Sequence, residues 1–403
     1  MTATARNLAL YPWYIFLRNL SFWQAIWFLF FQEQLSASEA ILLYAVYDIA
    51  TTAMEVPSGY LSDRFGRRLT LISSSIAGLL GVSLLASGSG FLAFALAQVL
   101  LGCHAAFASG TDSALLYESL AAEQRADEVE AAELRAWRYG FVALAISAVT
   151  GGAMALWFDR LPFIAAVISF VGVLTVSFTF TEPPREQASE RARLATLKHS
   201  LREPVLIWLF VLAVLMYGFS HLPFVFGQPF IEQALEGRGL DGSAPLISGV
   251  VSAVMMVLSV AASLYAARLR AWLGLAMILL LAFGMQIALA GILALTSNVI
   301  AIGFLFLRMV PNALSQPFIA ATIQPMLSDA SRATYISLRS LCGRLLFAAS
   351  LYAVSALASS AGEMEYPQIQ MILGWYALVG LILLTALGLA ALSVSLEQGN
   401  DDH

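Results

Sequence analysis

Long apolar stretches recur along the whole chain, and they constrain its fold more than any other feature. A helix needs about twenty apolar residues to cross the hydrocarbon core of a bilayer, and twelve segments of the sequence meet this length. With 60% hydrophobic and 12% charged residues, the 403-residue chain has about half the charge of a soluble domain. The pattern therefore predicts an all-α membrane protein with twelve transmembrane helices. The expected spans are residues 11–33, 39–61, 69–88, 91–119, 137–158, 161–180, 204–234, 244–267, 272–296, 299–327, 333–358 and 366–394.

Six spans lie on each side of a polar stretch, residues 181–203, which begins with two prolines and continues with a run of charged residues. No bilayer core would accept such a stretch. We therefore expect residues 181–203 to be a cytoplasmic linker between two six-helix bundles, residues 1–180 and residues 204–403. A faint internal repeat supports this division, because the basic segment 263–270 follows the second span of the second half.

The positive charges are strongly segregated between the two sides. Seventeen of the 21 lysines and arginines fall in loops on the side of the N-terminus, two fall in the opposite loops, and two lie inside spans. Because cytoplasmic loops carry the excess of lysine and arginine, this bias places both termini in the cytoplasm. The apolar run from Tyr11 is too long for a cleaved signal peptide, so residues 1–10 are predicted to form a short cytoplasmic tail.

The turn between the second and third spans, residues 59–68, reads Gly-Tyr-Leu-Ser-Asp-Arg-Phe-Gly-Arg-Arg. It fits the pattern Gly-x-Leu-(small)-Asp-Arg-x-Gly-Arg-Arg and resembles the signature of the major facilitator superfamily, which lies at the cytoplasmic junction of the second and third helices. The resemblance implies two pseudo-symmetric six-helix bundles with a site between them near the bilayer midplane, opened alternately to each side. An ordinary basic loop that obeys the charge rule is the alternative.

The resemblance also implies a cytoplasmic gate around this turn. Gly59 is expected to allow close helix approach and Gly66 to permit the tight reversal, while Asp63 can face an arginine or the positive end of a neighbouring helix. The residues predicted to form the gate are Glu55, Gly59, Asp63, Arg64, Gly66, Arg67, Arg68 and Glu118.

Two departures weaken the match to the proton-driven drug exporters of the superfamily. Residues 98–104 lack the arginine usual in the fourth helix, and residues 147–152 lack the proline of the antiporter motif. The runs 109–120 and 332–338, however, resemble a branch of bacterial exporters. The resemblance therefore implies a transporter of the bacterial inner membrane that exports a small organic molecule in exchange for protons. A proton-coupled importer and a non-transporting membrane receptor or assembly partner are the alternatives.

Charged residues inside the spans are few, and in hydrocarbon each costs about 2.5 to 3.5 kcal/mol. Arg18 and Asn19 in the first span and Asp112 in the fourth lie at matching depths. Since both helices line the cavity of a facilitator half, Arg18 and Asp112 are expected to pair beside the substrate. A purely structural ion pair is the alternative. The many aromatic residues of the first span are expected mostly to face lipid or to lie at the membrane interface.

Asp48 and Glu55 in the second span are two helical turns apart and therefore share one face. Asp48 lies near mid-membrane, where lost solvation favours proton uptake, so it is the leading candidate for the coupling proton site; permanent pairing with another residue is the alternative. His104 in the fourth span is a further candidate for titration, although helix packing explains it equally simply.

In the second half, Arg308, Asn312, Ser315 and Gln316 form a polar stripe along the tenth span, and His221 and Gln228 lie two turns apart in the seventh. Such stripes predict a binding surface, with Arg308 available to an acidic group on the substrate. An amphiphilic drug and a carboxylate-bearing metabolite such as a siderophore both fit this prediction. Hydrogen bonding between helices is the alternative for the neutral residues.

Other chemistry is not indicated. Cys103 and Cys342 have no cysteine partner nearby in sequence, and the four histidines show no metal-ligand spacing. No phosphate-binding loop or nucleophile motif is present, so we expect neither an enzyme nor a metal or cofactor site. The expected partners are a small-molecule substrate, protons and the lipid bilayer, without nucleic acid, and the chain is expected to function as a monomer.

Overall fold

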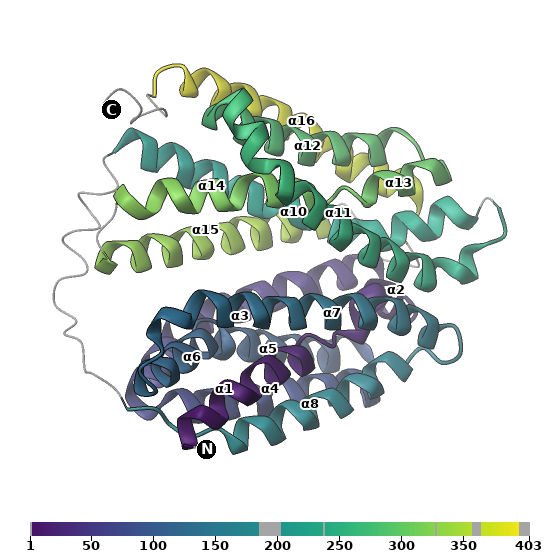
Figure 1. Ribbon diagram of the computed structural model, residues 1–403. Helices are drawn as coiled ribbons and strands as arrows, with labels where there is room; N and C mark the ends of the chain where they lie inside the picture. Colours follow the sequence, from purple (N-terminus) through teal and green to yellow (C-terminus); the bar gives the residue numbers. More distant parts are fainter. Residues whose placement is uncertain (1, 185–202, 237, 327–328, 357–363, 395–403) are drawn as a thin grey trace. The chain divides into compact units, whose positions relative to one another are not determined.

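The computed structural model describes residues 2–184, 203–236, 238–326, 329–356 and 364–394. Within these ranges the chain is helical, without β-strands, as Figure 1 shows. Contacts divide the chain into two compact units. The first holds the helices from α1 to α8 together with residues 242–253, which include the start of α11, and the second holds the rest of the described helices from α10 to α16. Nearly all of the expected linker lies outside the described residues.

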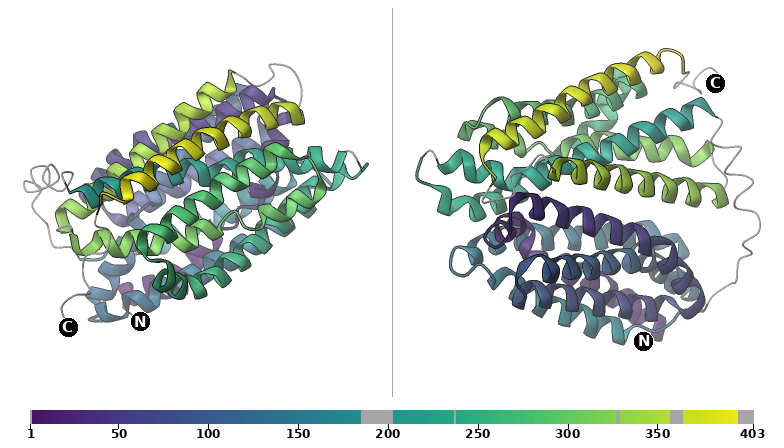
Figure 2. Two further views of the ribbon diagram at one scale, coloured as in Figure 1. Left: turned by 90° about the horizontal axis from the view of Figure 1, so that it is seen from above. Right: turned by 180° about the vertical axis from the view of Figure 1, so that it is seen from behind.

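The helices of the first unit run side by side in both orientations of Figure 2. The element bounds are α1 Ala3–Arg18, η1 Phe22–Ala25, α2 Trp27–Gln32, α3 Ala37–Phe65, α4 Arg67–Ser87, α5 Gly90–Ala108, α6 Thr111–Ala122, η2 Ala126–Glu128, α7 Val129–Ala155 and α8 Leu161–Thr179.

The second unit is built in the same way from long helices. Its elements are α10 Pro204–Glu236, η3 Asp241–Ser243, α11 Ala244–Leu273, α12 Leu275–Leu295, η4 Val299–Ala301, α13 Ile302–Leu305, α14 Val310–Met326, α15 Asp329–Ser355 and α16 Tyr366–Ala391. Two prolines lie inside α10, at Pro223 and Pro229, yet the helix is not interrupted there. Nine of the described helical segments are long and apolar enough to cross a membrane.

Within the described residues, helices lie at all twelve expected places, but three of these spans are broken. The first divides into α1, η1 and α2, the fourth into α5 and α6, and the tenth into η4, α13 and α14. Residues 3–10 of the predicted tail are helical, because α1 already begins at Ala3, where the side chain of Thr2 accepts the hydrogen bond of the Ala5 backbone N–H. Their place in the cytoplasm stays a prediction.

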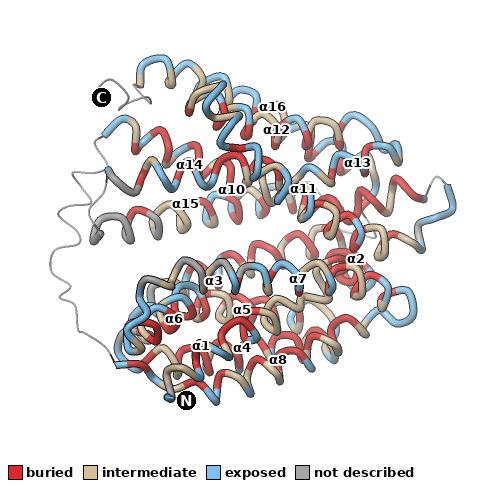
Figure 3. The backbone as a smooth tube through the Cα atoms, in the orientation of Figure 1, coloured by how far each residue is buried: buried red, intermediate tan, exposed pale blue. Residues whose placement is uncertain are grey.

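The core of the first unit depends on small residues and on rings. A Cβ atom at Gly102 of α5 would lie only 2.8 to 2.9 Å from atoms of α3, so glycine lets these two helices touch. Every residue of α2 is buried, as Figure 3 shows. The expectation that the aromatic residues of the first span mostly face lipid is therefore wrong for α2, where Phe30 and Phe31 pack against Phe94 and Phe163.

Single glycines join consecutive helices at equivalent places in the two units. Gly66 separates α3 from α4 with φ 120°, and Gly274 separates α11 from α12 with φ 78°. Both backbone conformations favour glycine over every other residue. Aligning these junctions places Ala271 opposite Asp63, so an alanine stands where the first half has an aspartate.

Candidate functional site

The first span breaks directly after Arg18. The side-chain amide of Asn19 donates to the carbonyl of Ile15 at 2.8 Å and so occupies one of the last carbonyls of α1. The chain then turns through η1, whose Phe22 carbonyl lies where a Cβ atom at Gly151 of α7 would be. Glycine at 151 therefore makes room for the turn. Arg18 lies in the last turn of α1, where the partial negative charge of a helix end favours a cation.

The fourth span breaks immediately before Asp112. Gly110 has φ 74° and precedes α6, so this glycine permits the change of direction. Asp112 lies in the first turn of α6 and its Oδ1 accepts the backbone N–H of Ser113 at 2.8 Å. The positive end of a helix thus faces a carboxylate.

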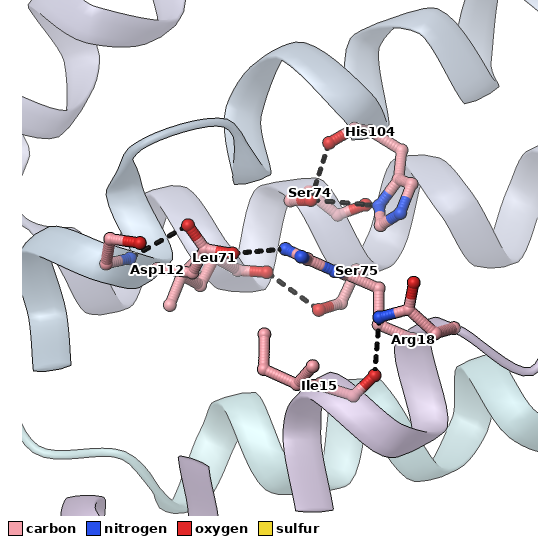
Figure 4. Close-up of polar contacts among 9 residues, drawn as sticks. Ile15, Arg18, Leu71, Ser74, Ser75, His104 and Asp112 are labelled. Carbon is pink, nitrogen blue, oxygen red and sulfur yellow. Dashed lines mark hydrogen bonds and ion pairs between the residues drawn. The ribbon is translucent and has the colours of Figure 1, made fainter. Parts of the chain in front are cut away.

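These two helix ends meet. Arg18 Nη1 donates to Asp112 Oδ2 at 2.6 Å, and the two side chains are 21% and 11% exposed. Figure 4 shows the guanidinium of Arg18 reaching from α1 to the carboxylate on α6. The predicted pair is therefore present, and each charge lies at the helix end of opposite sign. Its role in binding substrate or protons stays a prediction.

A cavity of about 310 Å³ lies beside this pair, entirely within the first unit. Three elements line it: α1 with its C-cap, α6, and α7. Its apolar part comes mainly from α7. The lining residues are Tyr11, Ile15, Arg18, Asn19, Asp112, Ser113, Glu133, Ala136, Gly140, Phe141 and Leu144.

Asp48 and His104 do not line this cavity. Asp48 is buried in α3, with 5% of its surface exposed, and it interacts with another group. His104 joins α5 to α4: its Nδ1 lies 3.0 Å from the carbonyl of Ser74, and the hydroxyl of Ser74 donates to the carbonyl of His104 at 2.8 Å. This arrangement, visible in Figure 4, is a helix-packing contact.

The signature turn is tied to α6 and to the segment that follows α8. Arg67 donates from Nε to Glu118 Oε1 on α6 at 3.1 Å and from Nη1 to Ser62 Oγ at 2.7 Å. The carboxylate of Glu182 accepts the backbone N–H groups of Arg67 and Arg68 at 2.9 and 2.8 Å. Glu182 therefore satisfies the otherwise unpaired donors at the start of α4.

The other predicted gate residues have different surroundings from one another. Arg68 donates to the carbonyl of Phe178 at 2.9 Å, whereas the exposed Arg64 contacts its neighbours Tyr60 and Phe65. Glu55 is partly buried in α3 and also interacts with another group. The side chain of Asp63 lies outside the described residues.

Gly59 does not serve the purpose expected of it within the described residues. A Cβ atom at this position would have nothing within 4 Å, so no close helix approach occurs there within the described part of the first unit. Gly66, by contrast, forms the tight reversal as predicted.

In the second unit, Arg308 lies in the break between α13 and α14. Its guanidinium stands 5.6 Å from the ring centroid of Phe224, its Nη1 is 3.4 Å from the carbonyl of Pro223, and its Nε contacts Met255 Sδ. These neighbours are neutral. The helices α11 to α14 contain no Asp or Glu, because none occurs from Gly242 to Ser328.

The remaining residues of the predicted polar stripes have separate surroundings. Asn312 Oδ1 accepts a hydrogen bond from Gln286 of α12 at 3.3 Å, and Gln316 is exposed on α14. His221 Nδ1 lies 2.6 Å from the carbonyl of Tyr217 in its own helix. Gln228 is buried in α10. The hydrogen bond between Asn312 and Gln286 is of the interhelical kind.

Sequence reasoning missed two carboxylates that matter here. Glu133 lines the cavity and Glu182 caps α4. Both had been assigned to regions outside the membrane core, Glu133 because the fifth span was expected to begin at residue 137, and Glu182 because it falls in the expected linker. The signal for Glu133 was its spacing of i, i+3 and i+7 with Ala136 and Gly140, which marks one face of a helix. In the part of the chain that the structure describes, no group of three His, Cys, Asp or Glu side chains could hold a metal ion.

Comparison with solved structures gives several proteins of the same fold. A nucleoside transporter, NupG, matches with a TM-score of 0.75 at 12% identity, over 96% of this chain and 99% of that one. An auto-inhibited peptide transporter of the POT family matches at 0.74 and 12% identity, over 99% and 98%. A bacterial homologue of the human lysosomal transporter Spinster, in an inward-facing and occupied conformation, matches at 0.69 and 15% identity, over 99% and 98%.

No curated relative matches the sequence. The family model described as Major Facilitator Superfamily, however, matches residues 8–351, which is most of the chain and includes the signature turn, the ion pair and Arg308. Taken with the twelve helical spans, this match shows that the chain is a multi-pass membrane protein that belongs to the Major Facilitator Superfamily of transporters.

Proposed function

We propose that this protein exports a small organic molecule from the cytoplasm in exchange for protons, and that Arg18 and Asp112 are the centre of that exchange. The observation that carries the proposal is the ion pair at 2.6 Å, held between two interrupted helices beside a cavity. Helices that are interrupted in mid-membrane place charged ends where a solute can reach them. A pair that served packing alone would need no adjoining space.

In this mechanism a proton that binds Asp112 Oδ2 removes the charge that holds Arg18. The guanidinium then loses its fixed partner, and α1 and α6 lose the strongest contact between their ends. Since a ligand shifts an equilibrium only through its different affinity for the two states, a proton on Asp112 favours the conformation in which α1 and α6 separate. The buried Asp48 of α3 is the other candidate proton carrier.

The network of Arg67, Glu118 and Ser62 is proposed to latch one of the two conformations, at the cytoplasmic end of the first unit. It links the signature turn to α6, the helix that carries Asp112. A movement of α6 at Asp112 would therefore also displace Glu118 and its contact with the signature turn. The proposed outward direction rests on the sequence runs that resemble exporters.

The test begins with a deletion strain, whose metabolite and drug-sensitivity profile identifies a solute. That solute is then followed in proteoliposomes containing the purified protein, with a pH gradient imposed in either direction. We expect the solute to move in the direction opposite to the protons as they flow down the imposed gradient. Asp112→Asn should abolish this dependence on the pH gradient. Glu128→Gln is the matched control, because Glu128 is exposed, pairs with Arg125 and does not line the cavity.

Solute that moves with the protons would make the protein an importer and refute the outward direction. If neither Asp112→Asn nor Asp48→Asn altered the response to the gradient, the proton sites would be wrong. A strain whose phenotype survived Asp48→Asn and Arg308→Ala, but not changes on the surface, would instead indicate a receptor or assembly partner.

A further inference from the structure

One carboxylate in the cavity has no part in the ion pair or in the proposed proton exchange. Glu133 lies in the second turn of α7 and lines the cavity together with Tyr11, Arg18 and Asp112. The phenol of Tyr11 is within electrostatic range of all three charged groups. The four side chains therefore surround one space.

The charges around this space do not cancel. Arg18 and Asp112 neutralise each other at 2.6 Å, and Glu133 forms no ion pair within the described part of the chain. The arginines closest to it on α7, Arg135 and Arg138, are exposed and do not line the cavity. The lining therefore carries one uncompensated negative charge.

The remainder of the lining determines what kind of cation fits. Ile15, Ala136, Phe141 and Leu144 offer an apolar wall, and Tyr11 adds an aromatic ring. A carboxylate in such surroundings attracts an opposite charge more strongly than in water, because the effective dielectric constant is lower. An anion would meet Glu133 without gaining Arg18, whose guanidinium is already engaged.

We propose that the cavity binds protonated amines that carry an apolar body, with Glu133 as their counter-ion and the pair of Arg18 and Asp112 as a neutral wall. This inference rests on the transport function proposed above and gives the chemical class of its substrate. It assigns to Glu133 a role in selecting substrates by charge, which is distinct from carrying the coupling proton.

The experiment measures binding by isothermal titration calorimetry on the purified full-length protein in detergent, without any gradient. The probes are three molecules of nearly equal shape: 4-phenylbutylamine, 4-phenylbutanol and 4-phenylbutyrate. We expect the amine to bind at least about tenfold more tightly than the other two, which corresponds to one favourable charge interaction of ordinary size.

Variants then locate the charge responsible. In Glu133→Gln the amine should bind no better than the alcohol, and in Glu133→Asp its preference should return. Glu128→Gln removes a glutamate near the same end of α7 but outside the cavity, and it should leave the preference intact. Thermal melting of each variant confirms that the protein is folded.

Tighter binding of the acid, an unchanged preference in Glu133→Gln, or an equal loss in Glu128→Gln would each overturn the inference. Because binding is measured without transport, the two proposals fail separately. A protein that binds the amine through Glu133 but moves no solute supports the site and refutes the transport function proposed above. One that transports other solutes and does not distinguish the three probes refutes the site alone.

Discussion

The two units place an arginine at a broken helix, but they stabilise its charge in different ways. In the first unit Arg18 lies at the end of α1 and forms an ion pair with Asp112, beside a cavity. In the second unit Arg308 lies between α13 and α14 and contacts the ring of Phe224, the Pro223 carbonyl and a thioether. One arginine is matched by a carboxylate, while three contacts of the other are neutral and a further interaction accompanies them.

The difference shows where each unit is vulnerable. Removing one member of an ion pair leaves the other charge buried and unmatched, which costs much more than the pair itself contributes. Losing the ring, carbonyl and thioether contacts described for Arg308 costs less, because none of these contacts leaves an opposite charge unmatched. On these contacts, we expect the first unit to depend more on its arginine for stability than the second unit does.

The largest effect is expected from breaking the pair in the first unit. Arg18→Gln and Asp112→Asn should each lower the free energy of unfolding by about 3 kcal/mol, because each leaves a charge without its partner. The double variant should cost less than the sum of the two. Thermal melting in detergent over this double-mutant cycle measures the coupling, and strictly additive losses would show that the two residues do not interact.

A smaller effect on stability is expected in the second unit. Arg308→Gln should lower the free energy of unfolding by about 1 kcal/mol, the size of a lost cation–π contact, while transport falls by at least about tenfold. Arg308→Lys should recover little, because an ammonium group lacks the planar surface of guanidinium. The same melting and transport assays apply. A loss of stability equal to that of Arg18→Gln would erase the contrast between the units.

The glycine junctions provide a comparison in which the units should agree. Gly66→Ala and Gly274→Ala should each cost about 1 to 2 kcal/mol, since both residues have positive φ. Gly59→Ala is the control: it lies inside α3 with open space around it, and it should be neutral or stabilising by up to about 1 kcal/mol. Melting temperatures decide, and a neutral Gly274→Ala would mean that only the first junction is constrained.

The smallest effect concerns pH at one end of the first unit. Hydrogen bonds from the hydroxyls of Thr2 and Thr4 lower the pKa of Glu123, and the interaction with Arg125 lowers the pKa of Glu128. Both groups are more acidic in the folded protein than in the unfolded chain. Their stabilisation is therefore fully present above the unfolded pKa of about 4.3 and is lost as the pH falls through the lower folded values.

Melting temperatures between pH 3 and pH 7 test this directly. Wild type should lose slightly more stability below about pH 4 than a variant carrying Thr2→Ala and Thr4→Ala, and the two should respond alike from pH 5 to 7. Any pH dependence of transport near neutrality must then come from other groups. A difference between the two proteins at pH 6 would contradict this assignment.

Much of the fold follows from local sequence patterns, and the errors have a common cause. Hydropathy located the twelve spans, and the charge-rich turn located the junction at Gly66. Hydropathy gives no information on where a helix is interrupted, however, so the breaks after Arg18 and before Asp112 were not predicted. It also treats an aromatic side chain as lipid-facing by default, whereas the rings of α2 fill the interior of the first unit.

The candidate site was predicted in part for a similar reason. Matching depths in two spans were enough to pair Arg18 with Asp112, since helix geometry converts residue number into height. Depth alone could not show that His104 is engaged with Ser74 in packing, or that Glu133 enters the cavity from α7. Which neighbour a side chain meets depends on how the helices pack around it, and the hydropathy pattern does not give that packing.

The sequence by itself determined that the chain folds in a bilayer. Apolar segments of bilayer length, and cations concentrated on one side, require a helical membrane protein. Only the tertiary structure decided how the predicted charges meet, because the ends of two interrupted helices bring Arg18 and Asp112 together across 94 residues of chain. That contact is set by backbone breaks at Asn19 and Gly110. At these two breaks, packing and an opposite charge on the facing helix stabilise the interrupted ends.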